Sequence, residues 1–158
     1  MTNIPESASP GDAIQLALWL ATRRGHTEFL DDAERWIRAR ILPCQITEEQ
    51  AKDAHGVVDQ RLRGGWGASR FPQGTQMSYT DVTAAVLHNL CDVYRHIAVR
   101  SEAGLTVNFH LDYEDPNVRI VSERNDCAKV TVTPGKQDNV RIRIPRWTPR
   151  ESVKITAD

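Results

Sequence analysis

Apolar residues recur along this chain with two different periods. Up to about residue 100 they return every three or four positions, which is the spacing of helices with one buried face. From Gly104 onward they alternate with polar residues, which is the spacing of strands. The pattern therefore predicts an α+β chain, with helical hairpins in residues 1–103 and an antiparallel sheet in residues 104–158.

Two helices joined by a tight turn are predicted first. The first has Asp12 as its N-cap and Gly25 as its stop, and its apolar face consists of Ile14, Ala17, Leu18 and Ala21. The second has Thr27 as its N-cap and ends at Pro43, with apolar residues at Phe29, Leu30, Ala33, Trp36, Ile37 and Ile41. The short connection predicts a helical hairpin.

Two further helices are predicted after this hairpin. Thr47 followed by Gln50 is a capping-box signature for a helix that runs toward Leu62, although Gly56 weakens it. The last helix starts at Thr80 and runs to about Arg100. Its apolar stripe consists of Val82, Val86, Leu90, Val93 and Ile97.

The segment between these two helices, residues 63–79, is rich in glycine and has no apolar period, so we expect a long loop. Trp66 and Arg70 are candidates for saccharide binding there, because an indole ring stacks on sugars and a guanidinium binds hydroxyl groups. Phe71 is a second aromatic residue in the same loop. The alternative is that these aromatic residues only anchor the loop to the protein.

The polar stripe of the last helix offers a second candidate site. Asp81 and His88 lie on it with Asp92 and Arg95. These groups could line a pocket that binds a saccharide. They could equally form a solvated face with an ion pair between His88 and Asp92, and Asp81 could simply complement the helix N-terminus.

Alternating residues predict five strands in the last third of the chain. The first covers Leu105 to Leu111, and Asp115-Pro116-Asn117 forms the turn after it. The apolar residues of the other four strands are Val118 and Ile120, Val130 and Val132, Val140 to Ile144, and Val153 to Ile155.

Composition narrows the possible partners. The 20 basic residues nearly balance the 21 acidic ones in this chain of 158 residues, so no strong field would attract nucleic acid or an anionic membrane. Arg141 and Arg143 form a short basic stripe without an aromatic platform. No apolar run is long enough to cross a bilayer, and the first ten residues lack the features of a signal peptide, so we expect a cytoplasmic protein. The three cysteines are widely spaced and predict neither a disulfide nor a metal site.

Several segments resemble glycoside hydrolase family 127 in sequence and in order. The helical hairpin reads GDAIQLALWLATRRGHTEFLDDAERWIRARILPCQIT, and it is followed by GGWGASRFP, DVYRHI, AGLTVNFHL and VRIRIPRW. The resemblance covers about Gly11 to Trp147. It implies helical hairpins from an incomplete (α/α)6 toroid, then one sheet of a β-sandwich, and activity on β-L-arabinofuranosides or related plant saccharides.

The chain also departs from this family. The family has a Cys-Cys pair at the start of the helix matched here by residues 81–97, where one thiolate is the nucleophile and the pair helps to bind zinc. Asp81 and Val82 stand there instead and cannot supply that chemistry. About four helices cannot close a ring of twelve, and the upstream glutamate and cysteine of the family's zinc site have no counterpart before Gly11.

We therefore expect a fragment or remnant of a glycoside hydrolase, inactive alone, with no catalytic residues, metal or cofactor of its own. One alternative is a glycosidase that uses carboxylates and is completed by a partner chain or by self-association, with Asp81, His88 and Asp92 as its candidate residues. Another is a protein-interaction module whose helices present uncovered apolar faces.

Overall fold

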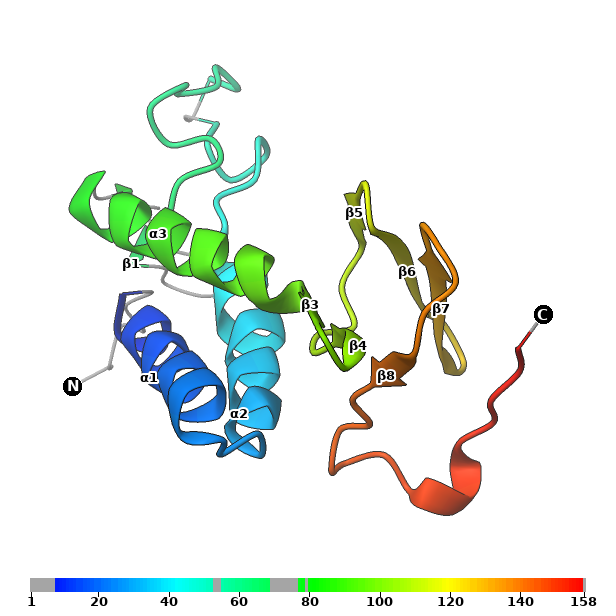
Figure 1. Cartoon of the computed structure of the whole chain (residues 1–158). Helices are drawn as coiled ribbons and strands as arrows, with labels where there is room; N and C mark the ends of the chain where they lie inside the picture. Colours follow the sequence, from blue (N-terminus) through cyan, green and yellow to red (C-terminus); the bar gives the residue numbers. More distant parts are fainter. Residues whose placement is uncertain (1–7, 53–54, 69–76, 79, 158) are drawn as a thin grey trace. The chain divides into compact units, whose positions relative to one another are not determined.

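The computed structural model describes residues 8–52, 55–68, 77–78 and 80–157. The chain divides into two compact units, Met1–Asp92 and Val93–Asp158. Helices make up most of the regular structure of the first unit, and strands most of that of the second (Figure 1). The predicted mixed α+β class is confirmed.

A helical hairpin forms the body of the first unit, as the apolar period predicted. It consists of α1 (Ala8–Arg24) and α2 (Phe29–Trp36), and the second helix continues through a π-helical turn (Ile37–Ile41) and a 3-10 turn (Leu42–Cys44). Gly25 ends α1 with φ of 76°, a left-handed conformation that glycine adopts without strain. The core between the two helices consists of Ile14, Ala17, Leu18, Ala21, Leu30, Ala33, Ile37 and Ile41.

Both predicted N-caps of this hairpin are wrong. Helix α1 begins at Ala8, so Asp12 lies inside it, because Pro10 is tolerated in the first turn of a helix and does not delay the start. Helix α2 has Glu28 as its N-cap, without a side-chain hydrogen bond. Thr27 lies in the turn before it, where its carbonyl accepts the Leu30 amide.

The third predicted helix is also wrong, although its capping box is present. The Thr47 amide donates to Oε1 of Gln50 at 2.9 Å, and the Gln50 amide donates to Oγ1 of Thr47 at 3.3 Å. Turns and one isolated antiparallel bridge between Lys52 and Val58 follow over the described part of residues 47–62, where Ala51 is the single buried residue. A helix here would have almost no apolar face to bury, and Gly56 with φ of 78° interrupts it.

A small two-stranded sheet comes after this region. Strand β1 (Gly67–Ala68) pairs antiparallel with β2 (Met77–Ser78). Helix α3 (Thr80–Ile97) then follows close to its predicted bounds. Val82, Val86, Val93 and Ile97 of its predicted apolar stripe are buried, and Leu90 is half-buried.

The change from helix to strand comes earlier than predicted. Strand β3 (Ala98–Ser101) starts directly after α3 and forms a tight hairpin with β4 (Gly104–Val107). Strand β8 (Val140–Ile142) pairs with the other side of β4 in parallel. Leu105, Val107 and Phe109 are buried, as their alternation predicted.

A second small sheet lies between β4 and β8 in the sequence. It is an antiparallel meander of β5 (Tyr113–Asp115), β6 (Val118–Arg124) and β7 (Ala128–Pro134). The predicted turn before β6 is present: Oδ1 of Asp115 accepts the amides of Asn117 at 2.7 Å and Val118 at 2.8 Å.

Two expectations for the strands are therefore corrected. The strands form two three-stranded sheets in place of one, because residues 113–134 pair locally and β8 pairs with β4 instead. The β4–β8 pair is parallel. Val153–Ile155 is not a strand, and it follows a 3-10 turn, Arg150–Ser152. Among the described helices, none is long and apolar enough to cross a membrane.

Candidate functional site

Trp66, the first sequence candidate for stacking a saccharide, is buried in the first unit. Only 3% of its surface is exposed, and its indole N–H donates to the carbonyl oxygen of Ile41 at 2.8 Å. The Trp66 amide and carbonyl both bond to the hydroxyl of Thr83, at 2.9 and 3.0 Å. The protein therefore covers the indole ring in this structure, which leaves little of its surface for stacking on a sugar.

Two other sequence candidates cannot be placed in a site. Arg70 and Phe71 lie outside the described residues. Asp81 belongs to the first turn of α3, but its side chain is outside the described part of the structure.

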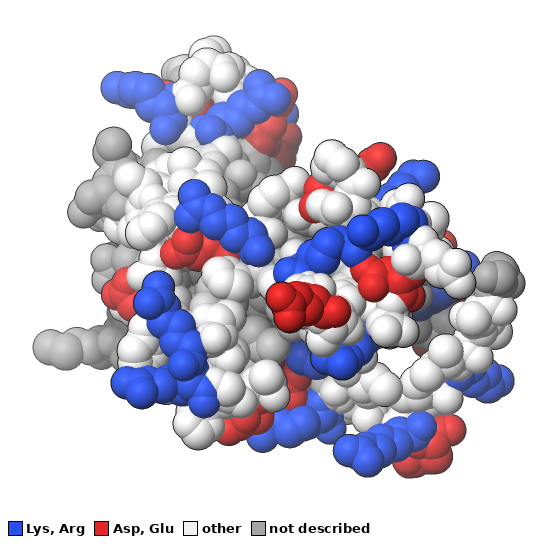
Figure 2. All heavy atoms as spheres, viewed as in Figure 1, with Lys and Arg blue, Asp and Glu red and all other residues white. Residues whose placement is uncertain are grey.

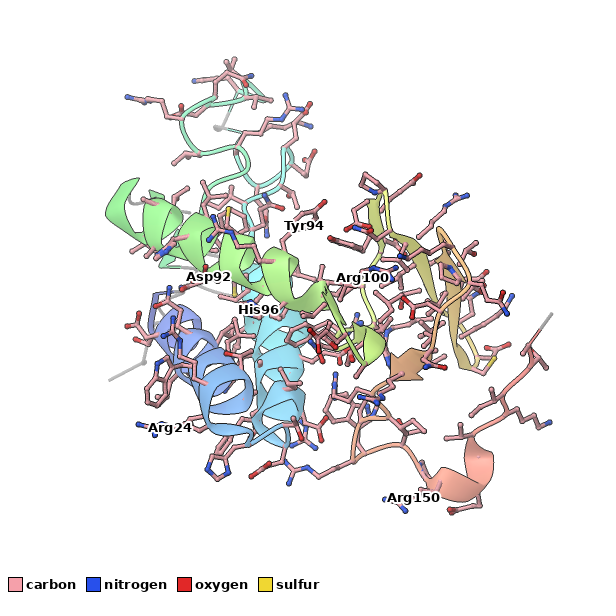
Figure 3. All side chains as sticks on the ribbon, in the orientation of Figure 1. Arg24, Asp92, Tyr94, His96, Arg100 and Arg150 are labelled. Atoms are coloured by element: carbon pink, nitrogen blue, oxygen red, sulfur yellow. The ribbon has the colours of Figure 1, made fainter. Side chains whose placement is uncertain are left out.

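His88, the remaining candidate, belongs to a polar cluster with Asp92 and Gln15. The amide nitrogen of Gln15 lies 3.3 Å from Nδ1 of His88 and 3.4 Å from Oδ2 of Asp92. Nε2 of His88 is 3.8 Å from the same carboxylate oxygen. The predicted pair one helical turn apart is present, and Gln15 connects it to α1; Figure 3 labels Asp92 on α3. We call these three residues the polar cluster.

The imidazole of His88 lies between two partners. Its Nδ1 faces the amide nitrogen of Gln15, and its Nε2 faces the carboxylate of Asp92. The His88 side chain is 68% exposed, whereas that of Asp92 is mostly covered. The polar cluster therefore offers solvent an imidazole edge, an amide and a carboxylate, which are groups that bind hydroxyls.

An exposed aromatic ring lies one helical turn from Gln15. Trp19 has 41% of its surface exposed, and the guanidinium carbon of Arg24 lies 5.2 Å from its ring centroid. Residues four apart share one face of a helix, so Trp19 and Gln15 are neighbours on α1. The sequence alone indicated neither residue as a candidate for the site, because their position near His88 and Asp92 depends on α3 lying beside this face of α1.

Of the two positions where the resemblance implied chemistry, one has a described side chain. Val82 is a buried core residue. Cys44 is half-buried, Cys91 and Cys127 are exposed, and all three are free thiols. Over the described ranges, no group of three or more His, Cys, Asp and Glu side chains is placed to hold a metal ion.

The acidic positions of the hairpin motif are also buried in the first unit. Glu34 is fully buried and accepts from Nε of Arg38 at 2.8 Å, and Asp31 is buried on the same helix. The ion pair between Glu34 and Arg38 joins two successive turns of this helical segment, and it gives the buried carboxylate a charged partner.

Basic and acidic side chains alternate over the visible face, without a patch of one sign (Figure 2). Arg143 of the predicted basic stripe donates to the Asn108 carbonyl and lies over the ring of Phe109. Both contacts lie within the second unit, so Arg143 helps to stabilise that unit.

No protein-family model, no curated protein and no solved structure matches this chain.

Proposed function

We propose that this chain is a fragment or remnant of a glycoside hydrolase that resembles family 127, and that it binds a plant-type saccharide weakly and does not hydrolyse it alone. The observation that carries the proposal is the polar cluster on α1 and α3, with the exposed ring of Trp19 one turn away. Amide, carboxylate and imidazole groups bind hydroxyls, and an indole ring packs against sugar C–H groups.

The lack of turnover follows from the residues at the start of α3. The resemblance assigns a nucleophilic thiolate to this point, and Val82 fills it with an apolar side chain in the core. Neither Val82 nor Asp81 can form the thiolate that this chemistry requires. The ordered resemblance of five segments and the observed order of helical hairpin before strands support the carbohydrate assignment.

Binding is tested on the full chain by nuclear magnetic resonance titration with arabinose-containing oligosaccharides. Amide shifts should map to α1 and α3, and Gln15→Ala and His88→Ala should each abolish them. His26→Ala is the matched control, because His26 is also exposed and lies 3.3 Å from a carboxylate, that of Glu28. Shifts that persist in both cluster variants would reject the site.

Catalysis is tested by metal analysis together with aryl-arabinofuranoside assays. We expect no stoichiometric zinc and no turnover, and the double change of Asp81 and Val82 to cysteine should not create turnover, since two ligands do not complete a zinc site. Turnover that Asp81→Ala abolishes would instead support the glycosidase that uses carboxylates and is completed by a partner chain.

One observation favours a second candidate, a protein-interaction module. Leu16, Trp36 and Leu42 of the hairpin are exposed large apolar residues. A binding surface for another protein would need such residues to form one contiguous apolar patch. Saccharide titrations without any shift, together with binding of a hydrophobic dye that Leu16→Asp removes, would favour this function over the first.

A further inference from the structure

Strand β8 has an open edge in the second unit. The sheet order is β3-β4-β8, so β8 pairs with β4 on one side only among the described strands. The Arg143 amide donates to the Val107 carbonyl, and the Leu105 amide donates to the Asn139 carbonyl. Successive residues of a strand direct their backbone groups to opposite sides, so Val140 and Ile142 present theirs to the open side.

The side chains along this edge are apolar and exposed. Val140, Ile142 and Ile144 alternate along the strand, and each has more than a third of its surface in solvent. Register places Val140 beside Leu105 and Ile142 beside Val107, both of which are buried. On this face of the sheet, the side chains of β4 are therefore buried, whereas those of β8 are exposed to solvent.

The same unit contains an extended segment without a strand partner. Residues 153–157 alternate apolar and polar, which is why the sequence predicts a strand there. Val153 has an extended backbone, with φ of −82° and ψ of 123°. Ile155 is 84% exposed, more than any other large apolar residue of the described chain. Figure 1 shows this segment, in red, running apart from the strands of its own unit.

The connection between β8 and this segment directs it away from its own sheet. Two proline turns follow each other, with the Thr148 amide bonded to the Pro145 carbonyl and the Ser152 amide to the Pro149 carbonyl. Proline fixes its own φ, so these turns resist the reversal that would lay the segment along its own β8. Exchange of an identical element between two copies is a low-cost route to a dimer.

We propose that residues 153–157 of one chain add as a strand to the open edge of β8 in a second copy, so that two copies exchange this segment. Val153 and Ile155 then lie on the side of Val140 and Ile142, and the backbone groups of the edge gain partners. The segment that occupies the open edge comes from an identical chain. Residues 153–157 and strand β8 are both already extended.

The charges of Lys154 and Arg141 make this pairing depend on the salt concentration. Lys154 falls on the other face, the face of Arg141, so two like charges come close and weaken the association. The exchanged dimer should therefore form more strongly at high salt. Lys154→Glu should strengthen it several-fold by pairing with Arg141, and Arg141→Glu combined with Lys154→Glu should remove that gain.

The test is sedimentation of the full chain and of two complementary variants. Ile155→Asp disables the segment, and Ile142→Pro blocks the edge by removing an amide that faces the open side. The native chain should form a species of twice 17.8 kDa. Each variant alone should be monomeric, because its affinity for a second copy of itself is lowered roughly tenfold or more. A mixture of the two should form a heterodimer. The Ile142→Pro chain still has an intact segment, and the Ile155→Asp chain still has an open edge to bind it.

Leu87→Asp is the matched control, since Leu87 is also a highly exposed apolar residue but belongs to α3. It should leave the dimer unchanged, and circular dichroism should show that Ile155→Asp and Ile142→Pro remain folded. A monomeric native chain, a dimer that Ile155→Asp leaves intact, or folded variants that fail to complement each other would overturn the proposal. Saccharide binding involves α1 and α3, so its presence or absence is judged separately.

Discussion

Gly11 lies directly against Asn89, and this contact sets how closely α1 and α3 approach within the first unit. A Cβ atom added to Gly11 would come 1.8 Å from Nδ2 of Asn89. Asn89 is buried, so its amide has little room to move, and its Oδ1 is a buried acceptor without a hydrogen-bond partner in the structure. The two helices meet at a point where glycine is required for space.

Gly11→Ala should therefore destabilise the protein. Alanine favours a helix by about 1 kcal/mol over glycine, but forcing a methyl group into a packed contact costs about 1–3 kcal/mol. We expect a net loss of up to about 2 kcal/mol in the free energy of unfolding by urea. The double variant with Asn89→Ala should recover most of the loss due to the methyl group, and equal losses with and without Asn89 would contradict the steric explanation.

Trp66→Phe should separate anchoring from saccharide binding. The change keeps an aromatic ring but removes the indole donor, leaving the buried Ile41 carbonyl without this bond. We expect a loss of about 1–3 kcal/mol in stability. Saccharide titrations of the folded variant should match those of the native chain. A selective loss of saccharide binding at unchanged stability would restore Trp66 as a binding residue.

Arg38 and Arg35 offer a matched pair on one helix. Arg38→Ala removes a partner of the fully buried Glu34 and should cost about 2–4 kcal/mol in thermal or urea unfolding. Arg35 is 3.9 Å from Asp32, and both side chains are exposed, so Arg35→Ala should cost less than about 1 kcal/mol. Equal effects of the two changes would show that burial of Glu34 does not govern the pair.

Tyr113 should ionise at a higher pH than a tyrosine with the ordinary pKa of 10.0. Burial, followed by the hydrogen bond to Asp115, raises the pKa of Tyr113 from 10.0 to about 12. Because the folded state holds this proton more tightly, its contribution to stability is complete below pH 10 and is lost as the pH rises toward 12. Tyrosinate absorbance follows the titration, and Asp115→Asn should move the pKa of Tyr113 back toward 10. A transition of Tyr113 near 10 in the folded native chain would refute this.

Local periodicity was sufficient to predict the hairpin and α3. Their apolar residues recur over three or more turns, and burial of one face decides such helices. The predicted helix from Thr47 failed although its capping box formed, because a cap fixes one turn and only Ala51 is buried after it. A cap signal thus predicts a helix only when an apolar face follows.

Pairing between distant segments could not be predicted from the sequence. Alternation identified Val140 and Ile142 as strand residues, but nothing local indicates that their partner is β4 or that the pair is parallel. The residues around His88 were incompletely predicted for the same reason. His88 and Asp92 are neighbours on one helix, whereas Gln15 joins them only through the packing of α1 beside α3.

The parallel pairing of β4 with β8 has a consequence for the order of folding. Residues 108–139 must be looped out before Leu105 can meet Val140, and closing so long a loop costs conformational entropy. The β3–β4 hairpin and the β5–β7 meander need only short loops and can form as soon as their residues leave the ribosome. Docking of β8 then completes the second unit, and its rate should limit the rate at which that unit reaches the native state.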